Sequence, residues 1–272
     1  MTCFSVRTHE NAPPEWKGDL NLSVHINDLA RQVVADDPAT ASQCRTLINW
    51  MFAEFEWSAT DYQHRTVEEI LVRRAGNCAE QAMVLNRLLR ALDIDTREIA
   101  EINIQPPRAE RGRRAEQMAA ERGPAASVFG HQHNDHRWLE VYDPSSATWF
   151  PADATLGLCG DHEWLMARMG FGSRPEVAQD MIVPIMVFVM DTEDRVLEDR
   201  TDHYVVELFA RYIEARTRAT NLLDDWRRVV HTLAQAGQRA FEGRESFFAY
   251  RDQIQQALDM YRAIESTYRE AQ

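Results

Sequence analysis

The sequence predicts an α+β fold in which a helix that begins at a cysteine packs on an antiparallel sheet, with an antiparallel helical hairpin at the C-terminus. Three observations support this fold class. Apolar residues recur at three- and four-residue spacing from Cys78 onward. Residues 96–104, 136–142 and 148–153 show the alternation and the aromatic and branched content of strands. Helical spacing then returns from Val205 to Tyr268.

Composition limits the classes of protein to which the chain can belong. Of its 272 residues, 44% are hydrophobic and 27% are charged, as in ordinary globular proteins. The net charge of −13 argues against non-specific binding to nucleic acid or to an anionic membrane. Residues 1–7 lack the apolar core of a signal peptide, and the longest apolar run, residues 181–190, is too short to span a bilayer.

Cysteine usage indicates the redox compartment. The four cysteines, Cys3, Cys44, Cys78 and Cys159, show no Cys-x-x-Cys spacing and are too few for a disulfide framework in a chain of this length. We therefore expect a cytoplasmic location with reduced thiols. A regulatory disulfide between Cys78 and Cys159 is a less favoured alternative.

The first third of the chain reads as an irregular arm followed by helices. Residues 21–35 and 41–55 have helical spacing, and Thr66 with Glu69 forms a capping-box pattern for a short helix before Gly76. The next helix begins at Cys78 and runs for about four turns. Its expected apolar stripe is Ala79, Ala82, Met83, Leu85, Leu88, Leu89 and Leu92, with Glu80 and Gln81 on the opposite face.

The middle of the chain alternates strands with an insertion. Residues 96–104 are expected to form the first strand, and residues 136–142 and 148–153 a hairpin across the turn at Asp143. Residues 108–130 form an insertion with five arginines and three glutamates, against the acidic balance of the whole chain. It is either a solvated surface segment or a lid that receives an anionic substrate or acyl carrier.

The C-terminal part is predicted to be mostly helical. Asp161 could cap a short helix, and Pro184 places the apolar strand 181–190 at a sheet edge or a bulge. A long helix then runs from about Val205 until Gly237 and Gly243 interrupt it, and a second helix follows. The apolar stripe of this pair needs a partner, which is either the core or a second copy of the chain.

Three residues suggest nucleophilic chemistry when they are taken together. Cys78 at a helix start lies near unpaired backbone N–H groups and the positive end of the helix dipole, which favour a thiolate. A cysteine nucleophile needs a base and the base needs an orienting group, and His136 and Asp153 on two adjacent predicted strands supply both. Each residue alone would more often be structural; the combination predicts a Cys-His-Asp triad.

The motifs around these residues carry a resemblance to a known family. Gly76-x-Cys78, then His136-x-Trp138, then Trp149-x-x-x-Asp153-x-Thr155 resembles the transglutaminase-like superfamily over about residues 44–158. The resemblance implies a papain-like core and covers neither the insertion nor the C-terminal hairpin. We expect this core at residues 41–200, between an N-terminal arm and helix at 1–40 and the hairpin at 201–272. It also implies a thioester acyl-enzyme on Cys78, with His136 as base and Asp153 as its orienting residue.

Further site residues are candidates only. The backbone N–H of Cys78 is one expected oxyanion donor, and a second is expected from Trp57, Tyr62 or Gln63. Other candidates to line the cleft are Asn77, His133 and Trp138. His131, His133 and His136, with Cys78 or Cys159, could bind zinc, but the spacing fits no familiar zinc module, so we expect neither a metal nor a cofactor.

The resemblance leaves the reaction and its partners open. The favoured hypothesis is an acyltransferase or amide synthase that passes a peptide, protein, small-molecule or carrier-bound acyl group to an amine. A peptidase or amidase, which would hydrolyse the same intermediate, is the first alternative. A non-catalytic binding or assembly module with a relic triad is the second, with homodimerisation through the C-terminal helices.

Overall fold

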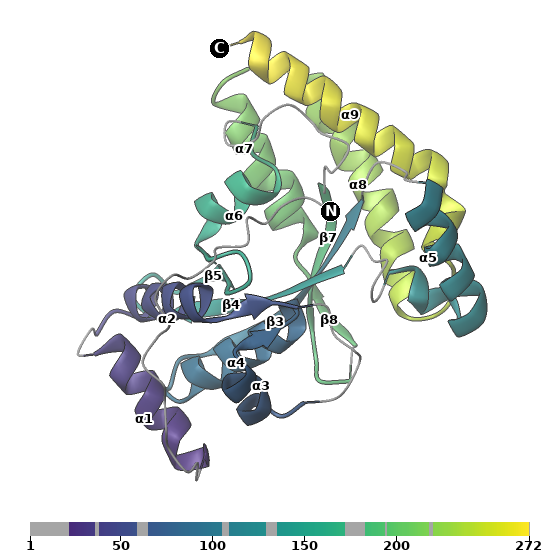
Figure 1. Ribbon diagram of the computed structural model, residues 1–272. Helices are drawn as coiled ribbons and strands as arrows, with labels where there is room; N and C mark the ends of the chain where they lie inside the picture. Colours follow the sequence, from purple (N-terminus) through teal and green to yellow (C-terminus); the bar gives the residue numbers. More distant parts are fainter. Residues whose placement is uncertain are drawn as a thin grey trace.

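A six-stranded antiparallel sheet between two layers of helices organises the protein (Figure 1). In this computed structural model the described residues are 22–35, 38–58, 65–104, 109–128, 135–171, 183–193, 195–217 and 220–271. The strand order is β6-β5-β4-β3-β7-β8, so consecutive strands are mostly neighbours. The α+β fold predicted from the sequence is confirmed.

The strands correspond closely to the predicted segments. The main sheet contains β3 (Thr96–Ile104), β4 (Asp135–Asp143), β5 (Thr148–Asp153), β6 (Leu158–Cys159), β7 (Val183–Met190) and β8 (Val196–Asp199). A separate two-stranded parallel pair, β1 (Glu56–Trp57) and β2 (Ala75–Gly76), lies directly before the helix that begins at Cys78. The hairpin of β4 and β5 forms as predicted, with Leu139 opposite Ala152.

One face of the sheet is covered by the N-terminal helices. These helices are α1 (Leu22–Val34), α2 (Thr40–Glu54), α3 (Val67–Arg73) and α4 (Cys78–Arg90). They form one apolar core with residues of β4 such as Leu139 and Val141. Because side chains alternate along a strand, Trp138 belongs instead to the core on the opposite face.

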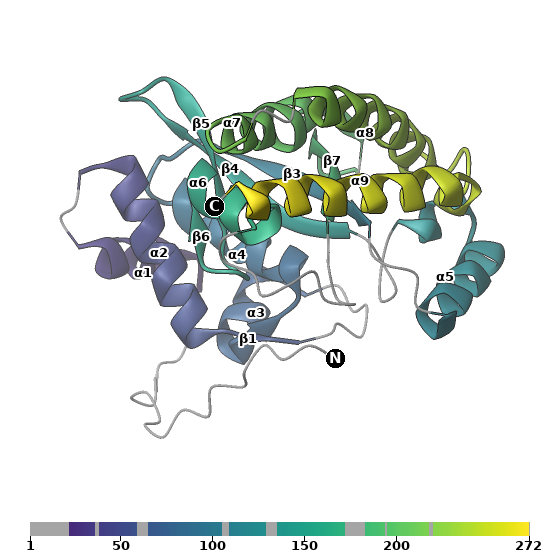
Figure 2. The same cartoon turned by 90° about the horizontal axis from the view of Figure 1, so that it is seen from above.

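The other face is covered by the C-terminal helices (Figure 2). They are α6 (Asp161–Arg168), the π-helix η2 (Asp202–Leu208), α7 (Phe209–Glu214), α8 (Thr220–Phe241), η3 (Phe247–Tyr250) and α9 (Arg251–Glu270). The segment between β3 and β4 contains α5 (Ala109–Arg122) and η1 (Pro124–Ser127). Helix α5 lies beside the start of α9, where Arg251 pairs with Glu116.

The apolar stripe of the C-terminal hairpin is covered by the sheet. A single core contains Ile102 and Met186 of the sheet together with Leu233 of α8 and Leu258 of α9. Of the two partners that the sequence left open, the core therefore occupies this stripe. Homodimerisation through these helices stays a prediction, as do the domain boundaries at residues 40 and 200.

Gly237 corrects one detail of the sequence interpretation, and Pro184 decides between two alternatives. Gly237 does not interrupt the helix but lies within α8, where a Cβ would come within 3.2 Å of Met186 Sδ and 3.3 Å of Ile102 Cδ1. The residue is small because helix and sheet approach closely there. Of the sheet edge and the bulge that the sequence left open for Pro184, the structure has the bulge: β7 pairs with both β3 and β8, and Pro184 lies at a register shift opposite Asn103.

Two predicted details of helix ends have different outcomes. The Thr66–Glu69 capping box is confirmed, with Glu69 N donating to Thr66 Oγ1 at 3.2 Å and Thr66 N to Glu69 Oε2 at 2.7 Å. Asp161 is not the cap of α6: it is the first helical residue, and Gly160 precedes it with φ of +102°.

Candidate active site

Helix α4 presents Cys78 from a tightly fixed N-terminus. Asn77 caps the helix: its Oδ1 accepts from Glu80 N at 2.8 Å, and Glu80 Oε2 accepts from Asn77 N at 3.0 Å. Arg65 Nη1 donates to the same carboxylate at 2.8 Å. The Gln81 amide donates to Gly76 O at 3.1 Å. The backbone on both sides of the half-exposed Cys78 is therefore held in place before any substrate binds.

Gly76 is required by the close approach of this cap. A Cβ at this position would lie 2.9 Å from Glu80 Cβ and 3.0 Å from Glu80 Oε2. Gly76 also pairs with Trp57 across the parallel strands β1 and β2, and Ser58 N donates to Gly76 O at 3.1 Å. The glycine of the Gly-x-Cys motif thus allows the cap, the small strand pair and the nucleophile helix to meet.

His136 and Asp153 are joined by a short hydrogen bond. The distance between His136 Nε2 and Asp153 Oδ2 is 2.6 Å, and the two side chains are 12% and 1% exposed. The other oxygen of Asp153 accepts from Thr155 N at 3.0 Å and Leu156 N at 3.2 Å. Asp153 is therefore both a turn residue and the partner of His136.

The thiol of Cys78 completes this arrangement. Its side chain is hydrogen-bonded to the His136 side chain. Since Nε2 of the ring is engaged by Asp153, Nδ1 is the nitrogen that remains for the sulfur. The structure therefore brings the three predicted residues Cys78, His136 and Asp153 together from α4, β4 and β5.

Electrostatics favour the charged form of His136. Burial of the ring opposes a positive charge, and the nearby Arg168 opposes it further. The negative charge of Asp153 and the hydrogen bonds of the ring with Asp153 and Cys78 outweigh both effects and raise the pKa of His136 from 6.5 to about 10. At neutral pH an imidazolium next to the sulfur stabilises a thiolate and can later donate its proton.

A buried carboxylate lies behind His136 and was not anticipated from the sequence. Glu101 is directly opposite His136 in the sheet and is fully buried. It accepts from Trp138 Nε1 at 3.1 Å, from Trp164 Nε1 at 3.2 Å and from Arg168. This cluster fixes the position of Arg168, the cation that acts on His136. Because polar and apolar residues alternate along this strand, no signal in the sequence separates Glu101 from its polar neighbours Glu98 and Asn103.

The remaining predicted site residues have different outcomes. Trp138 does not line a cleft, because its side chain is 1% exposed and its indole is engaged by Glu101. Asn77 uses its side chain to cap α4. Trp57 is 59% exposed and lies opposite Gly76, two residues before the cysteine. Tyr62, Gln63 and His133 lie outside the described residues.

No metal cluster is found in the part of the chain that the structure describes: it contains no group of three or more His, Cys, Asp and Glu side chains able to hold an ion. The alternative zinc site needs His131 and His133, which fall outside that part. Among the described helices, none combines the length and the apolar character needed to cross a bilayer.

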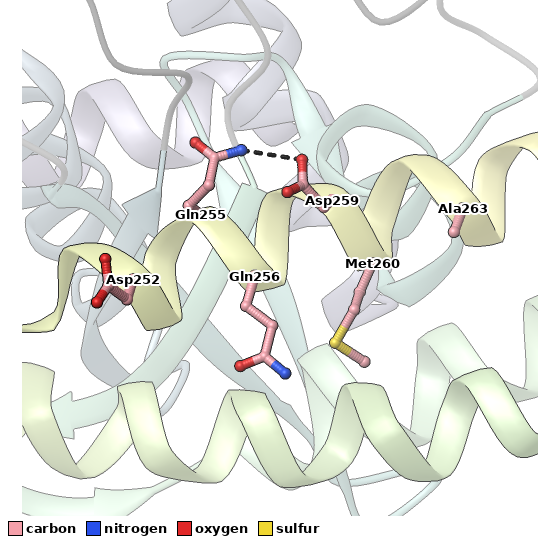
Figure 3. A pocket seen from close by; sticks show the side chains of 6 residues that line it. All are labelled: Asp252, Gln255, Gln256, Asp259, Met260 and Ala263. Carbon is pink, nitrogen blue, oxygen red and sulfur yellow. Dashed lines mark hydrogen bonds between the residues drawn. The ribbon is translucent and has the colours of Figure 1, made fainter.

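The surface depression shown in Figure 3 lies away from these residues in the fold. It is lined along one helix by Asp252, Gln255, Gln256, Asp259, Met260 and Ala263 of α9. Gln255 Nε2 donates to Asp259 Oδ1 at 2.9 Å. The depression contains no member of the Cys78–His136–Asp153 arrangement, so we do not assign the chemistry to it.

Comparison with known families agrees with this fold and with the motifs around Cys78, His136 and Asp153. Residues 27–154 match the model of the transglutaminase-like superfamily. The resemblance that the sequence motifs indicated is therefore confirmed for this region, which contains Cys78, His136 and Asp153. Comparison with curated proteins gives no match.

Three of the solved structures with partial similarity come from bacteria. A candidate cysteine protease from Cytophaga hutchinsonii is 19% identical, with a TM-score of 0.36 over 51% of this chain and 41% of that one. The periplasmic domain of TgpA from Pseudomonas aeruginosa is also 19% identical, with a TM-score of 0.36 over 52% and 47%. A candidate protease from Parabacteroides distasonis is 10% identical, with a TM-score of 0.37 over 62% and 26%. The chain spans less than half the length of each.

Proposed function

We propose that the protein is a cysteine-dependent acyltransferase that forms or exchanges an amide bond through a thioester on Cys78. The observation that supports this most directly is the continuous contact from the Cys78 thiol through the His136 ring to Asp153, with 2.6 Å between His136 Nε2 and Asp153 Oδ2. The match of residues 27–154 to the transglutaminase-like superfamily supports the same reaction class.

In this proposal each side chain has one role. The Cys78 sulfur attacks the acyl carbonyl carbon as a thiolate, and His136 holds the proton. His136 then gives this proton to the leaving group as the tetrahedral intermediate collapses to the thioester. In the second half-reaction His136 takes a proton from the incoming amine, which attacks the thioester and releases Cys78. Asp153 holds the ring orientation throughout.

The oxyanion needs two donors, and of the three upstream candidates Trp57 is the one that lies within the described residues. The backbone N–H of Cys78 at the start of α4 is one donor, since the first N–H groups of a helix lack intrahelical partners. Trp57 pairs with Gly76 and is exposed beside the helix start. Loss of one oxyanion donor typically costs about 3–4 kcal/mol of transition-state stabilisation.

The insertion joins the two strands on which Glu101 and His136 lie opposite each other. Strand β3 ends at Ile104. Two residues earlier, Ile102 pairs with Asp135, which directly precedes His136 in β4. The chain returns to the sheet at Asp135 after α5 and η1. We propose that this basic insertion, residues 108–130, contacts the acyl donor, with an anionic or carrier-bound acyl group as the best fit to its charge.

The proposal is tested by trapping the acyl-enzyme. Wild type and Cys78→Ala are incubated with a panel of acyl donors, and intact mass and peptide mapping locate any adduct. Cys44→Ala serves as the matched control, because it removes a buried cysteine of α2 by the same substitution. We expect an adduct on Cys78 in wild type and in the control, and none in Cys78→Ala.

The fate of the adduct separates transfer from hydrolysis. Release of the trapped thioester that accelerates with added amine, and yields the amide, supports acyl transfer. Rapid release in water with no effect of amine replaces the proposal by the peptidase or amidase alternative. Absence of an adduct with every donor class, together with Cys78 alkylation no faster than in the denatured chain, favours the relic-triad module instead.

A further inference from the structure

A second pair of sulfurs lies outside the site described above. Cys44 on α2 and Cys159 on β6 are both free thiols, and their side chains are hydrogen-bonded to each other. The sequence had suggested Cys78 as the alternative partner of Cys159. The structure instead directs the Cys78 thiol to His136 and places Cys159 against Cys44.

Hydrogen bonds and an ion pair connect the backbone segments that carry the two thiols. Arg45, the residue after Cys44, donates from Nη2 to Cys159 O at 2.6 Å and forms a two-pronged ion pair with Glu163 at 2.5 and 2.6 Å. Glu163 Oε2 in turn accepts from Cys159 N at 3.0 Å. The Cys159 sulfur also approaches Ala41 O of α2, at 4.0 Å. The sulfurs are thus held next to each other by groups on both sides.

The two thiols have unequal electronic environments. The hydrogen bond from Cys44 and the positive charge of Arg45 lower the pKa of Cys159, despite its burial and the nearby Glu163. The hydrogen bond with Cys159, reinforced by burial, raises the pKa of Cys44 well above its ordinary value. Cys159 is also 8% exposed, whereas Cys44 is 0% exposed. Cys159 is therefore the sulfur that a small reagent reaches first and that reacts as a thiolate.

We propose that Cys44 and Cys159 form a reversible disulfide on exposure to a peroxide. The Cys159 thiolate attacks the peroxide O–O bond, giving a sulfenic acid and, for hydrogen peroxide, one water after protonation. Cys44 then attacks the sulfenic sulfur, the S–S bond forms, and the departing hydroxide takes the Cys44 proton as a second water. Two thiols are oxidised and one peroxide is reduced; a dithiol reductant reverses the bond.

The disulfide would connect the helical layer to the strand beside the candidate active site. Strand β6 pairs with β5, with Leu158 opposite Asp153 and Cys159 opposite Ala152. A bond from Cys159 to α2 therefore restrains the strand that neighbours Asp153. Because the bond closes a loop of more than 100 residues, we expect oxidation to raise the Tm by roughly 5–10 °C.

Peptide mapping of the oxidised full-length chain tests the proposal. The chain is treated with a small excess of hydrogen peroxide, remaining thiols are alkylated under denaturing conditions, and disulfide-linked peptides are identified with and without dithiothreitol. We expect a Cys44–Cys159 link, the loss of two hydrogen atoms in intact mass, and full reversal by dithiothreitol. Cys78→Ser serves as the control that retains this link.

Two single variants test the order of the steps. In Cys44→Ser, dimedone should trap a sulfenic acid on Cys159; in Cys159→Ser, labelling of Cys44 should be at least about tenfold weaker. A link between Cys78 and either cysteine, oxidation of Cys159 to a sulfinic acid without a link, or two unmodified thiols would each overturn the proposal. All three contrary outcomes can be observed in the peptide map of the wild type, so the proposal can be refuted even if a variant folds poorly.

Discussion

Asp153→Asn is the substitution that separates charge from shape at the triad. Asp153 Oδ1 accepts from two backbone N–H groups, and Oδ2 faces His136 Nε2. An asparagine that keeps the backbone bonds presents its NH₂ group to Nε2, which must then be an acceptor. The ring proton is forced onto Nδ1, the nitrogen that faces Cys78. His136 can then no longer accept the thiol proton.

The magnitude follows from the electrostatics of the ring. The gap between a pKa of about 10 and the reference value of 6.5 corresponds to about 5 kcal/mol in favour of the imidazolium. Without the Asp153 charge, burial and Arg168 dominate, and both lower the pKa of His136. We therefore expect His136 in Asp153→Asn to titrate at or below about 6.5, and acylation of Cys78 to slow by about 10⁴-fold through the wrong tautomer.

The assay combines an NMR titration of His136 with the rate of Cys78 acylation, in wild type, Asp153→Asn and Asp143→Asn. Asp143 is the matched control: it ends β4, is hydrogen-bonded to Ser145 and Ser146, and is not part of the site. A His136 pKa that stays near 10 in Asp153→Asn, or an equal loss of rate in the control, would refute the electrostatic reasoning.

Three further predictions concern stability. Because the pKa of His136 is raised on folding, the stabilisation of the folded state by the protonated ring is complete below about pH 6.5 and is lost as pH rises toward 10. The free energy of unfolding in urea should therefore decline across this range in wild type but not in Asp153→Asn. Arg168→Met leaves the Glu101 charge buried without its cation and should cost about 3–5 kcal/mol by urea unfolding; a loss below about 1 kcal/mol contradicts the buried pair. Asn77→Ala removes the cap of α4 and should cost about 1 kcal/mol, whereas unchanged stability would mean that the capping box contributes nothing.

The sequence predicted the features that local chemistry determines. The Thr66–Glu69 capping box needs only residues three apart, and the strands 96–104 and 148–153 follow from their local composition. The combination of Cys78, His136 and Asp153 could be predicted because a nucleophile, a base and an orienting group constrain one another chemically.

Features that depend on distant segments could not be predicted. Glu80 and Gln81 were expected on the solvent side of their helix, but both are buried, because they hold Arg65 and Gly76, whereas Met83 is 40% exposed. Glu101 was expected on a polar strand face. The C-terminal helices cover that face and turn the carboxylate into a buried hydrogen-bond acceptor.

The central claim is that Cys78 and His136 act as one catalytic unit, and the acylation rate of Cys78 tests it most directly. Wild type, His136→Ala and Cys78→Ala are mixed with p-nitrophenyl acetate, and the acetylated residue is identified by peptide mass over time. We predict acetylation confined to Cys78 in wild type, none in Cys78→Ala, and a rate lower by about 10²–10⁴-fold in His136→Ala. Equal rates in wild type and His136→Ala, or acetylation of another cysteine instead, would contradict the claim.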